Sequence, residues 1–146
     1  MRILTVFLFA LLPIGATAQQ ADQQASQQRD SFFEDYQDYA RFVDSHIMNR
    51  DFIELIQVLG GRDEYTIEQL QGINQRFVTL FPKDFLSRAV VRKTDLGDGF
   101  SQEMRVYWGN NDGYNYFYAL LHAREDGLVV LTFTMNSNVS EVLSEF

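Results

Sequence analysis

Apolar residues recur at helical spacing in three successive segments of the first half of the chain. These segments cover about residues 31–47, 52–59 and 66–80. In each segment the apolar positions fall on one side of a helix, as in an amphipathic surface helix. The pattern therefore predicts three consecutive helices. Their expected apolar faces consist of Phe32, Phe33, Tyr36, Tyr39, Ala40, Val43 and Ile47, then Phe52, Leu55, Ile56 and Leu59, then Ile67, Leu70, Ile73, Phe77 and Leu80.

Short motifs mark the expected ends of these helices. Ser31 with Glu34, and Thr66 with Gln69, have the spacing of a capping box, in which side chain and backbone satisfy each other's hydrogen bonds. The glycine pair at 60–61 suits the left-handed conformation that ends many helices. These motifs place the first helix start at Ser31 and the third at Thr66.

The second half of the chain has the pattern of an antiparallel sheet. Four segments rich in β-branched and aromatic residues cover about 85–94, 100–108, 114–122 and 128–136. Glycine-containing turns separate them, and connections this short join only antiparallel neighbours. Asn138 then begins a short closing helix. We therefore expect an α+β fold, with N-terminal helices packed on a curved four-stranded meander.

Alternation along the strands predicts two different sheet faces. If the turns keep the register, one face is aromatic with polar tips, and the other is almost uniformly apolar. The first face consists of Met104, Val106, Trp108, Tyr114, Tyr116, Tyr118, Leu120, His122, Val130 and Thr132. The second consists of Phe117, Ala119, Leu121, Val129, Leu131, Phe133 and Met135.

The aromatic face supplies the candidate ligand site. A curved sheet with apolar walls and a few hydroxyl groups can line a binding pocket. The alternative is an ordinary half-exposed face, because tyrosine is a common strand former. The expected ligand-binding residues are Met104, Trp108, Tyr114, Tyr116, Tyr118 and His122.

The N-terminus has the features of an export signal. Residues 1–18 combine an early Arg2, an apolar run and a small-residue cleavage motif, which are typical of a signal peptide. Residues 19–28 contain six glutamines and no large apolar side chain, so we expect a flexible leader. A single domain over 29–146 follows. The protein is expected to be exported, and periplasmic if its source has two membranes.

Composition excludes several classes of function. The formal net charge of −8 argues against nucleic acid, which requires a basic face. The chain has no cysteine, which excludes a thiol nucleophile and a cysteine metal site. No apolar stretch is long enough to span a membrane once the signal is cleaved. We found no motif for a metal or cofactor, and expect neither.

Catalytic and charged motifs are few. His46 and His122 are the only imidazoles. Asp44, Ser45 and His46 are adjacent, so on a helix they point in different directions and form no preassembled triad; a solvated helix end is expected. Arg88 and Arg92 are expected on one side of the first strand of the meander, where charge protects a sheet edge from pairing.

The order of elements resembles the nuclear-transport-factor-like or cystatin-like α+β superfamily. Helices precede a long curved antiparallel meander over about residues 30–146. The resemblance implies a pocket between helices and sheet and often a dimer; some of its members are isomerases or dehydratases. We expect non-catalytic binding of an apolar or aromatic small molecule, or of an envelope protein. The alternatives are a proton-transfer enzyme using His122 or His46 with a tyrosine, and a structural homodimer.

Overall fold

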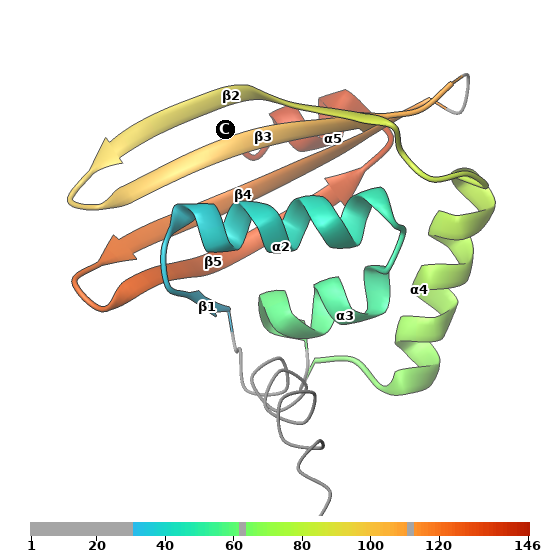
Figure 1. Ribbon diagram of the computed structural model, residues 1–146, viewed down its shortest axis with the longest axis horizontal. Helices are drawn as coiled ribbons and strands as arrows, with labels where there is room; N and C mark the ends of the chain where they lie inside the picture. The colour runs from blue at the N-terminus through green and yellow to red at the C-terminus, as the bar shows by residue number, and fades with distance from the viewer. Residues whose placement is uncertain (1–30, 62–63, 111–112) are drawn as a thin grey trace, which may run out of the picture.

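The computed structural model describes residues 31–61, 64–110 and 113–146 (Figure 1). It has an α+β fold, in which helices and one antiparallel sheet pack together. The helical segments are α2 (Tyr36–Met48), α3 (Phe52–Ile56), the π-helical turn η1 (Gln57–Gly61), α4 (Ile67–Leu80) and α5 (Val139–Leu143). The strands are β1 (Phe32–Phe33), β2 (Ser87–Gly97), β3 (Phe100–Trp108), β4 (Tyr114–Arg124) and β5 (Gly127–Asn136). The predicted signal peptide (1–18) and leader (19–28) lie outside the described residues.

The sheet contains the predicted meander and one additional strand. Its order is β1-β5-β4-β3-β2, and every pair is antiparallel. The prediction of four strands was therefore wrong, because Phe32 and Phe33 pair with β5 and do not belong to the first helix. Ser31 initiates this pairing, since its carbonyl accepts a hydrogen bond from the Val130 amide at 2.8 Å.

The first helix accordingly begins later than the capping motif predicted. Ser31 has a φ of 59°, which is incompatible with a helix start, and Asp35 is the N-cap. The Asp35 side chain accepts a hydrogen bond from the Asp38 amide at 2.8 Å. The other predicted ends are confirmed: Thr66 forms a capping box, and Asn138 caps α5.

The main core lies between the helices and one face of the sheet. Helices α2 and α3 cover this face, whereas α5 packs on the opposite one (Figure 1). The apolar face predicted on β4 forms part of this core. Its largest fully buried side chains include Tyr39, Tyr107, Phe33, Phe52, Phe81 and Phe117.

Two of the three register shifts in the sheet, at Leu131 in β5 and at Val91 in β2, change which predicted residues share a face. Tyr116 lies opposite Val106 and Tyr118 opposite Met104, so these pairs share a face as predicted. An extra residue in β5, Leu131, then shifts the register against β4. As a result Val130 faces the helices and Val129 the other side, the reverse of the prediction.

The second bulge, at Val91, separates two arginines. Arg88 lies opposite Tyr107, and Arg92 lies opposite Met104. Because Tyr107 and Met104 are on opposite faces of β3, the two arginines point to opposite sides of the sheet. The prediction that they share one side was wrong, since strict alternation does not hold across a bulge.

Candidate functional site

The structure divides the six predicted ligand-binding residues into two groups. Trp108, Tyr114 and Tyr116 form a partly exposed aromatic strip at one end of β3 and β4. The ring centroids of Trp108 and Tyr114 lie 6.3 Å apart, and those of Tyr114 and Tyr116 lie 6.2 Å apart. A binding role for this strip stays a prediction.

The other three predicted residues pack within the protein. Met104 and Tyr118 are buried with Val142 of α5, and Tyr118 makes an edge contact with Phe146. His122 stacks on Phe100 with ring centroids 4.0 Å apart. The C-terminal helix therefore covers the part of the aromatic face where Met104 and Tyr118 lie.

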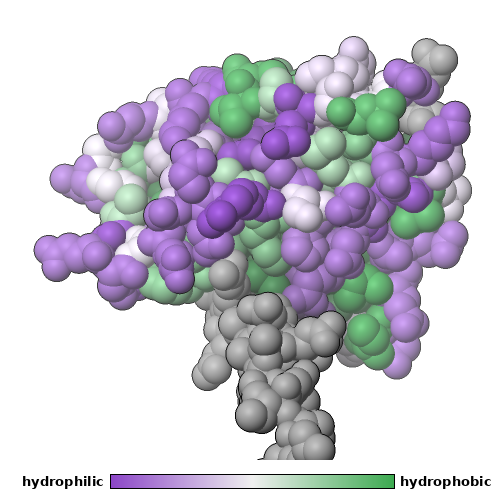
Figure 2. Space-filling model, in the orientation of Figure 1, coloured by the Kyte–Doolittle hydropathy of each residue, from purple (hydrophilic) through white to green (hydrophobic). Residues whose placement is uncertain are grey.

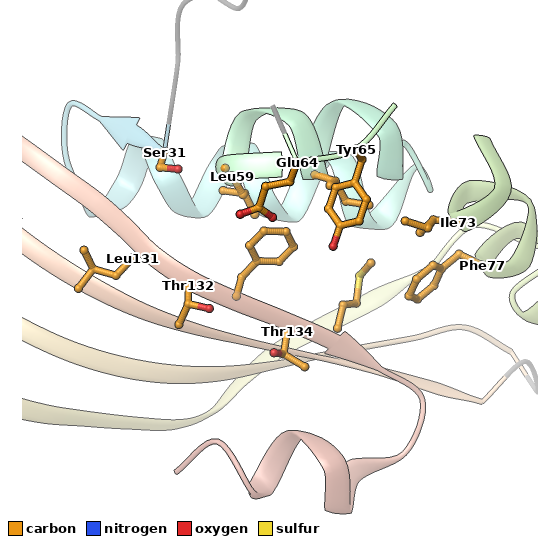
Figure 3. A pocket seen from close by; sticks show the side chains of 13 residues that line it. Ser31, Leu59, Glu64, Tyr65, Ile73, Phe77, Leu131, Thr132 and Thr134 are labelled. Atoms are coloured by element: carbon orange, nitrogen blue, oxygen red, sulfur yellow. The ribbon is translucent and has the colours of Figure 1, made fainter. Parts of the chain in front are cut away.

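A groove lies elsewhere, between the helices and β5. It has a volume of about 420 Å³ and is partly open to solvent. Figure 3 shows the side chains that line it. None of the six predicted residues lines it. Its apolar lining consists of Ile56, Leu59, Ile73, Phe77, Leu131, Phe133 and Met135, and its polar lining of Ser31, Glu64, Tyr65, Thr132 and Thr134, with Gly60 beside them.

The wall that β5 contributes shows that the groove lies at the edge of the sheet. All five residues from Leu131 to Met135 line it. Thr132 and Thr134 belong to one face of the sheet, whereas Phe133 and Met135 belong to the other. A cavity over one face would contact alternate residues only. The groove therefore follows the outer edge of β5, where side chains of both faces are reachable.

Within the described residues, this edge has no strand partner beyond Val130, because β1 is only two residues long. β1 pairs with Leu128 and Val129, and the Ser31 carbonyl bonds to Val130. From Leu131 to Asn136 no described strand pairs with β5 on this side. The bulge at Leu131 begins where the pairing with β1 ends. The result is a stretch of six residues whose outer backbone groups have no described strand partner.

Helix α4 forms the opposite wall and is only partly packed. Leu70 is buried, but Ile67 and Leu80 are 48% and 52% exposed, although the pattern placed both on the packed face. Ile73 and Phe77 point into the groove (Figure 3). Apolar patches also interrupt the hydrophilic surface on the α4 side of the molecule (Figure 2).

A smaller hollow continues the groove along α4. It has a volume of about 210 Å³ and shares Phe77 and Met135 with the main groove. Arg76 and Leu80 of α4 line it together with Ser137. The two hollows thus form one elongated site, which Glu64 lines in its first part and Arg76 in its second.

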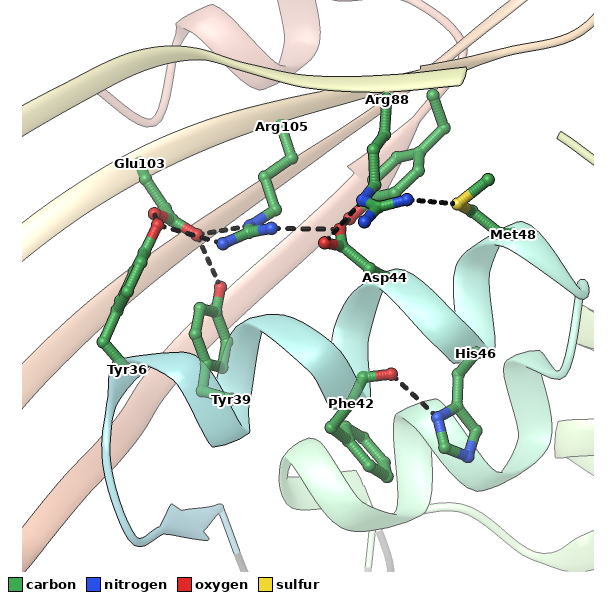
Figure 4. Close-up of polar contacts among 10 residues, drawn as sticks. Tyr36, Tyr39, Phe42, Asp44, His46, Met48, Arg88, Glu103 and Arg105 are labelled. Atoms are coloured by element: carbon green, nitrogen blue, oxygen red, sulfur yellow. Dashed lines mark hydrogen bonds and ion pairs between the residues drawn. The ribbon is translucent and has the colours of Figure 1, made fainter. Parts of the chain in front are cut away.

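A second feature is a buried polar network between α2 and β3 (Figure 4). Glu103 is fully buried and accepts hydrogen bonds from Arg105 Nε at 2.6 Å, from the Tyr36 hydroxyl at 2.7 Å and from the Tyr39 hydroxyl at 3.1 Å. Arg105 Nη1 also donates to Asp44 at 3.0 Å. The expectation that Asp44 belongs to a solvated helix end was therefore wrong.

Asp44 is held by two further donors in the same network. The Tyr107 hydroxyl donates to Asp44 Oδ1 at 2.8 Å, and Arg88 Nε donates to Asp44 Oδ2 at 2.8 Å. Burial, followed by the neighbouring carboxylate of Glu103, raises the pKa of Tyr36 to about 12. Two acidic and two basic side chains balance each other here. The network therefore serves to fix α2 on the sheet.

The two histidines lie apart from the groove. The Nδ1 of His46 lies 2.8 Å from the Phe42 carbonyl oxygen, and since a carbonyl only accepts, this nitrogen carries the proton. His122 stacks on Phe100. Neither lines the elongated site. Within the described ranges, no group of three or more metal-binding side chains is close enough together to hold a metal ion.

Comparisons with protein families, curated proteins and solved structures found no match to this chain. Across the residues described, no helix has the length and apolar character needed to cross a membrane. Sequence reasoning missed the groove, because its β5 wall depends on the bulge and on the short β1. One signal was present: Leu131 to Asn136 is a β-forming stretch without a charged residue.

Proposed function

We propose that the protein is a non-catalytic binding module that takes up an elongated apolar ligand in the groove between α4 and β5. The single observation that carries this proposal is the five-residue wall from Leu131 to Met135, which faces apolar side chains of α4 across an open groove. Ligand sites are typically concave and mainly apolar, with a few polar groups that fix orientation. Here those polar groups are Thr132, Thr134 and Tyr65.

We also propose that the protein is exported through the predicted signal peptide. We further propose that it is related to the nuclear-transport-factor-like or cystatin-like superfamily. An exported binding module meets ligands outside the cytoplasm. The groove is also compatible with the pocket between helices and sheet that the resemblance implies, although here it lies at a sheet edge. No second function is proposed, because neither histidine shares the groove with another polar group.

Fluorescence of Nile red, a neutral apolar dye, tests the proposal. We expect the chain lacking residues 1–18 to bind the dye with a saturable increase in emission. Selective binding to the native state also raises thermal stability, by about 2.7 kcal/mol at a hundredfold excess over Kd. Leu131→Glu should weaken dye binding at least tenfold, because it places a charge on the groove wall.

A matched control comes from the β2–β3 hairpin. Leu96 is exposed to a similar extent, at 52% compared with 47% for Leu131, and does not line the groove. Leu96→Glu should therefore leave the dye affinity unchanged. Equal loss in both variants, or no saturable binding by the unmodified chain, would overturn the proposed function.

A further inference from the structure

The free edge of β5 identifies the class of ligand more closely. We propose that the groove binds an extended polypeptide segment, which adds a strand to β5 beyond the end of β1. This inference rests on the proposed function, since it uses the same groove. A peptide that pairs with a sheet edge gains affinity from backbone hydrogen bonds and specificity from its alternate side chains.

The two outer edges of the sheet differ in a way that favours pairing at β5. β2 forms one edge and contains Arg88, Arg92, Lys93 and a bulge, which are devices that discourage pairing. The unpaired part of β5, Leu131 to Asn136, contains no charge and is rich in threonine and apolar residues. Among the described strands, the β5 edge therefore combines backbone without a strand partner and an apolar groove that can receive side chains.

The charges of the elongated site specify the partner's chemistry. Glu64 lines the part whose β5 wall is Leu131 to Met135, and Arg76 lines the part next to Asn136 and Ser137. A complementary strand has a basic residue along the Leu131–Met135 part and an acidic residue near Asn136. The residues between these two charges are uncharged and favour β-strands. A strand of six residues extends over about 20 Å.

The direction of the added strand follows from β1. β1 runs antiparallel to β5 and ends its pairing next to Leu131. A strand placed in line with β1 is also antiparallel, which is the slightly more stable arrangement. Its N-terminal end then lies near Asn136 and its C-terminal end near Leu131. The partner is thus a segment with an acidic residue first and a basic residue later in the strand.

Two blocked hexapeptides test this assignment by isothermal titration with the chain lacking residues 1–18. The first is acetyl-Glu-Val-Thr-Val-Thr-Lys-amide, and the second is its charge-reversed form, acetyl-Lys-Val-Thr-Val-Thr-Glu-amide. We expect the first to bind at least tenfold more tightly. The double variant Glu64→Lys and Arg76→Glu should invert this preference, and both side chains are exposed, so folding should be unaffected.

Methylation of the peptide's backbone nitrogens separates strand addition from simple apolar uptake. In a paired strand, alternate N–H groups point toward β5 and the others toward solvent. Methylating one alternate set should therefore reduce the affinity at least tenfold, whereas methylating the other set should change it little. Equal effects of both sets, or no preference between the two charge orders, would overturn strand addition.

Two further outcomes also decide the proposal. Saturable Nile red binding without binding of either peptide would overturn the peptide assignment and leave the proposed function standing. The second outcome concerns the chain's own segment before Ser31. If the peptides bind only after residues 19–28 are deleted, that segment occupies the edge, and an external peptide partner is excluded.

Discussion

At the scale of single residues, Glu103 is central to the attachment of α2 to the sheet. It accepts hydrogen bonds from Arg105, Tyr36 and Tyr39 while fully buried. Glu103→Gln keeps the shape but leaves the Arg105 guanidinium without its closest counter-charge. Breaking a buried ion pair from one side costs about 3–5 kcal/mol. We expect that loss in the free energy of unfolding, measured by urea denaturation.

A surface ion pair provides the control for this variant. Arg124 Nη2 lies 2.8 Å from Asp126, but both side chains are about half exposed. Exposed pairs contribute about 0–1 kcal/mol, so Arg124→Ala should barely change stability. If Glu103→Gln proves as mild as Arg124→Ala, the network does not fix α2 on the sheet.

The tyrosines of the network predict loss of stability at high pH. Burial and the nearby carboxylate raise the pKa of Tyr36 from 10.0 to about 12, and burial raises the pKa of Tyr39 and Tyr107 as well. In the unfolded chain these hydroxyls ionise near pH 10, while in the folded chain they stay neutral. Their contribution is therefore complete below pH 10 and is lost as the pH rises toward 12 and above.

Thermal unfolding across this range, with tyrosinate absorbance recorded in parallel, measures the effect. The melting temperature should change little up to about pH 10 and then fall. Above that pH the buried tyrosine hydroxyls should ionise together when the protein unfolds. Tyrosinate absorbance that rises fully near pH 10 in the folded protein would show that these hydroxyls are accessible, contrary to the structure.

Asn115 is a buried polar residue that is expected to lower the free energy of unfolding. Its side chain is fully buried, and neither its Nδ2 nor its Oδ1 has a hydrogen-bond partner among the described residues. An unsatisfied buried polar group costs about 1–3 kcal/mol. Asn115→Leu, which keeps a branched side chain, should therefore raise the free energy of unfolding by about 1 kcal/mol in urea denaturation. A marked loss of stability would instead show that the amide is bonded in solution.

At the scale of elements, Gly127 allows β1 to lie against the start of β5. Its φ is 149°, and an added Cβ would lie 2.5 Å from both Phe32 Cζ and the Phe33 carbonyl oxygen. Gly127→Ala should destabilise the fold by more than about 1 kcal/mol, because backbone atoms must move. Thermal or urea unfolding measures the change.

Gly72 is the matched control within α4. An added Cβ there meets nothing within 4 Å. Alanine is favoured over glycine inside a helix by about 0.5–1 kcal/mol, so Gly72→Ala should stabilise the protein. A neutral or stabilising effect of Gly127→Ala would contradict the description of β1 as a closely packed edge strand.

The elements also show how far the sequence determines the fold. Periodicity located the three main helices and the antiparallel meander, because hydrophobic spacing directly reports which face is buried. Hydrophobic periodicity did not predict irregularities that involve only one or two residues. The bulge at Leu131 reversed Val129 and Val130, and a two-residue pairing turned Phe32 and Phe33 into a strand.

The candidate site was less accessible to sequence reasoning than the fold. Its walls come from α4 and from the edge of β5, which are distant in sequence and meet only in the folded protein. The alternation of apolar and polar residues along a strand predicts which face of the sheet each side chain is on. It does not predict which strand lies at the edge of the sheet. The aromatic face drew attention because its tyrosines alternate, yet α5 covers Met104 and Tyr118 within it.

At the scale of the whole molecule, the two sides of the sheet have different roles. One face carries the core and the polar network under α2, and the other supports α5. Exposed apolar side chains of α4 and of the β5 edge, among them Ile67, Leu80 and Leu131, lie around or beside the elongated site. We expect binding to be confined to this corner of the molecule.

Amide hydrogen exchange with and without saturating Nile red tests this central claim most directly. The account predicts that the dye slows exchange in β5 from Leu131 to Asn136 and in α4, and leaves the strip of Trp108, Tyr114 and Tyr116 unchanged. Slower exchange confined to that aromatic strip, with no change in β5 or α4, would contradict it.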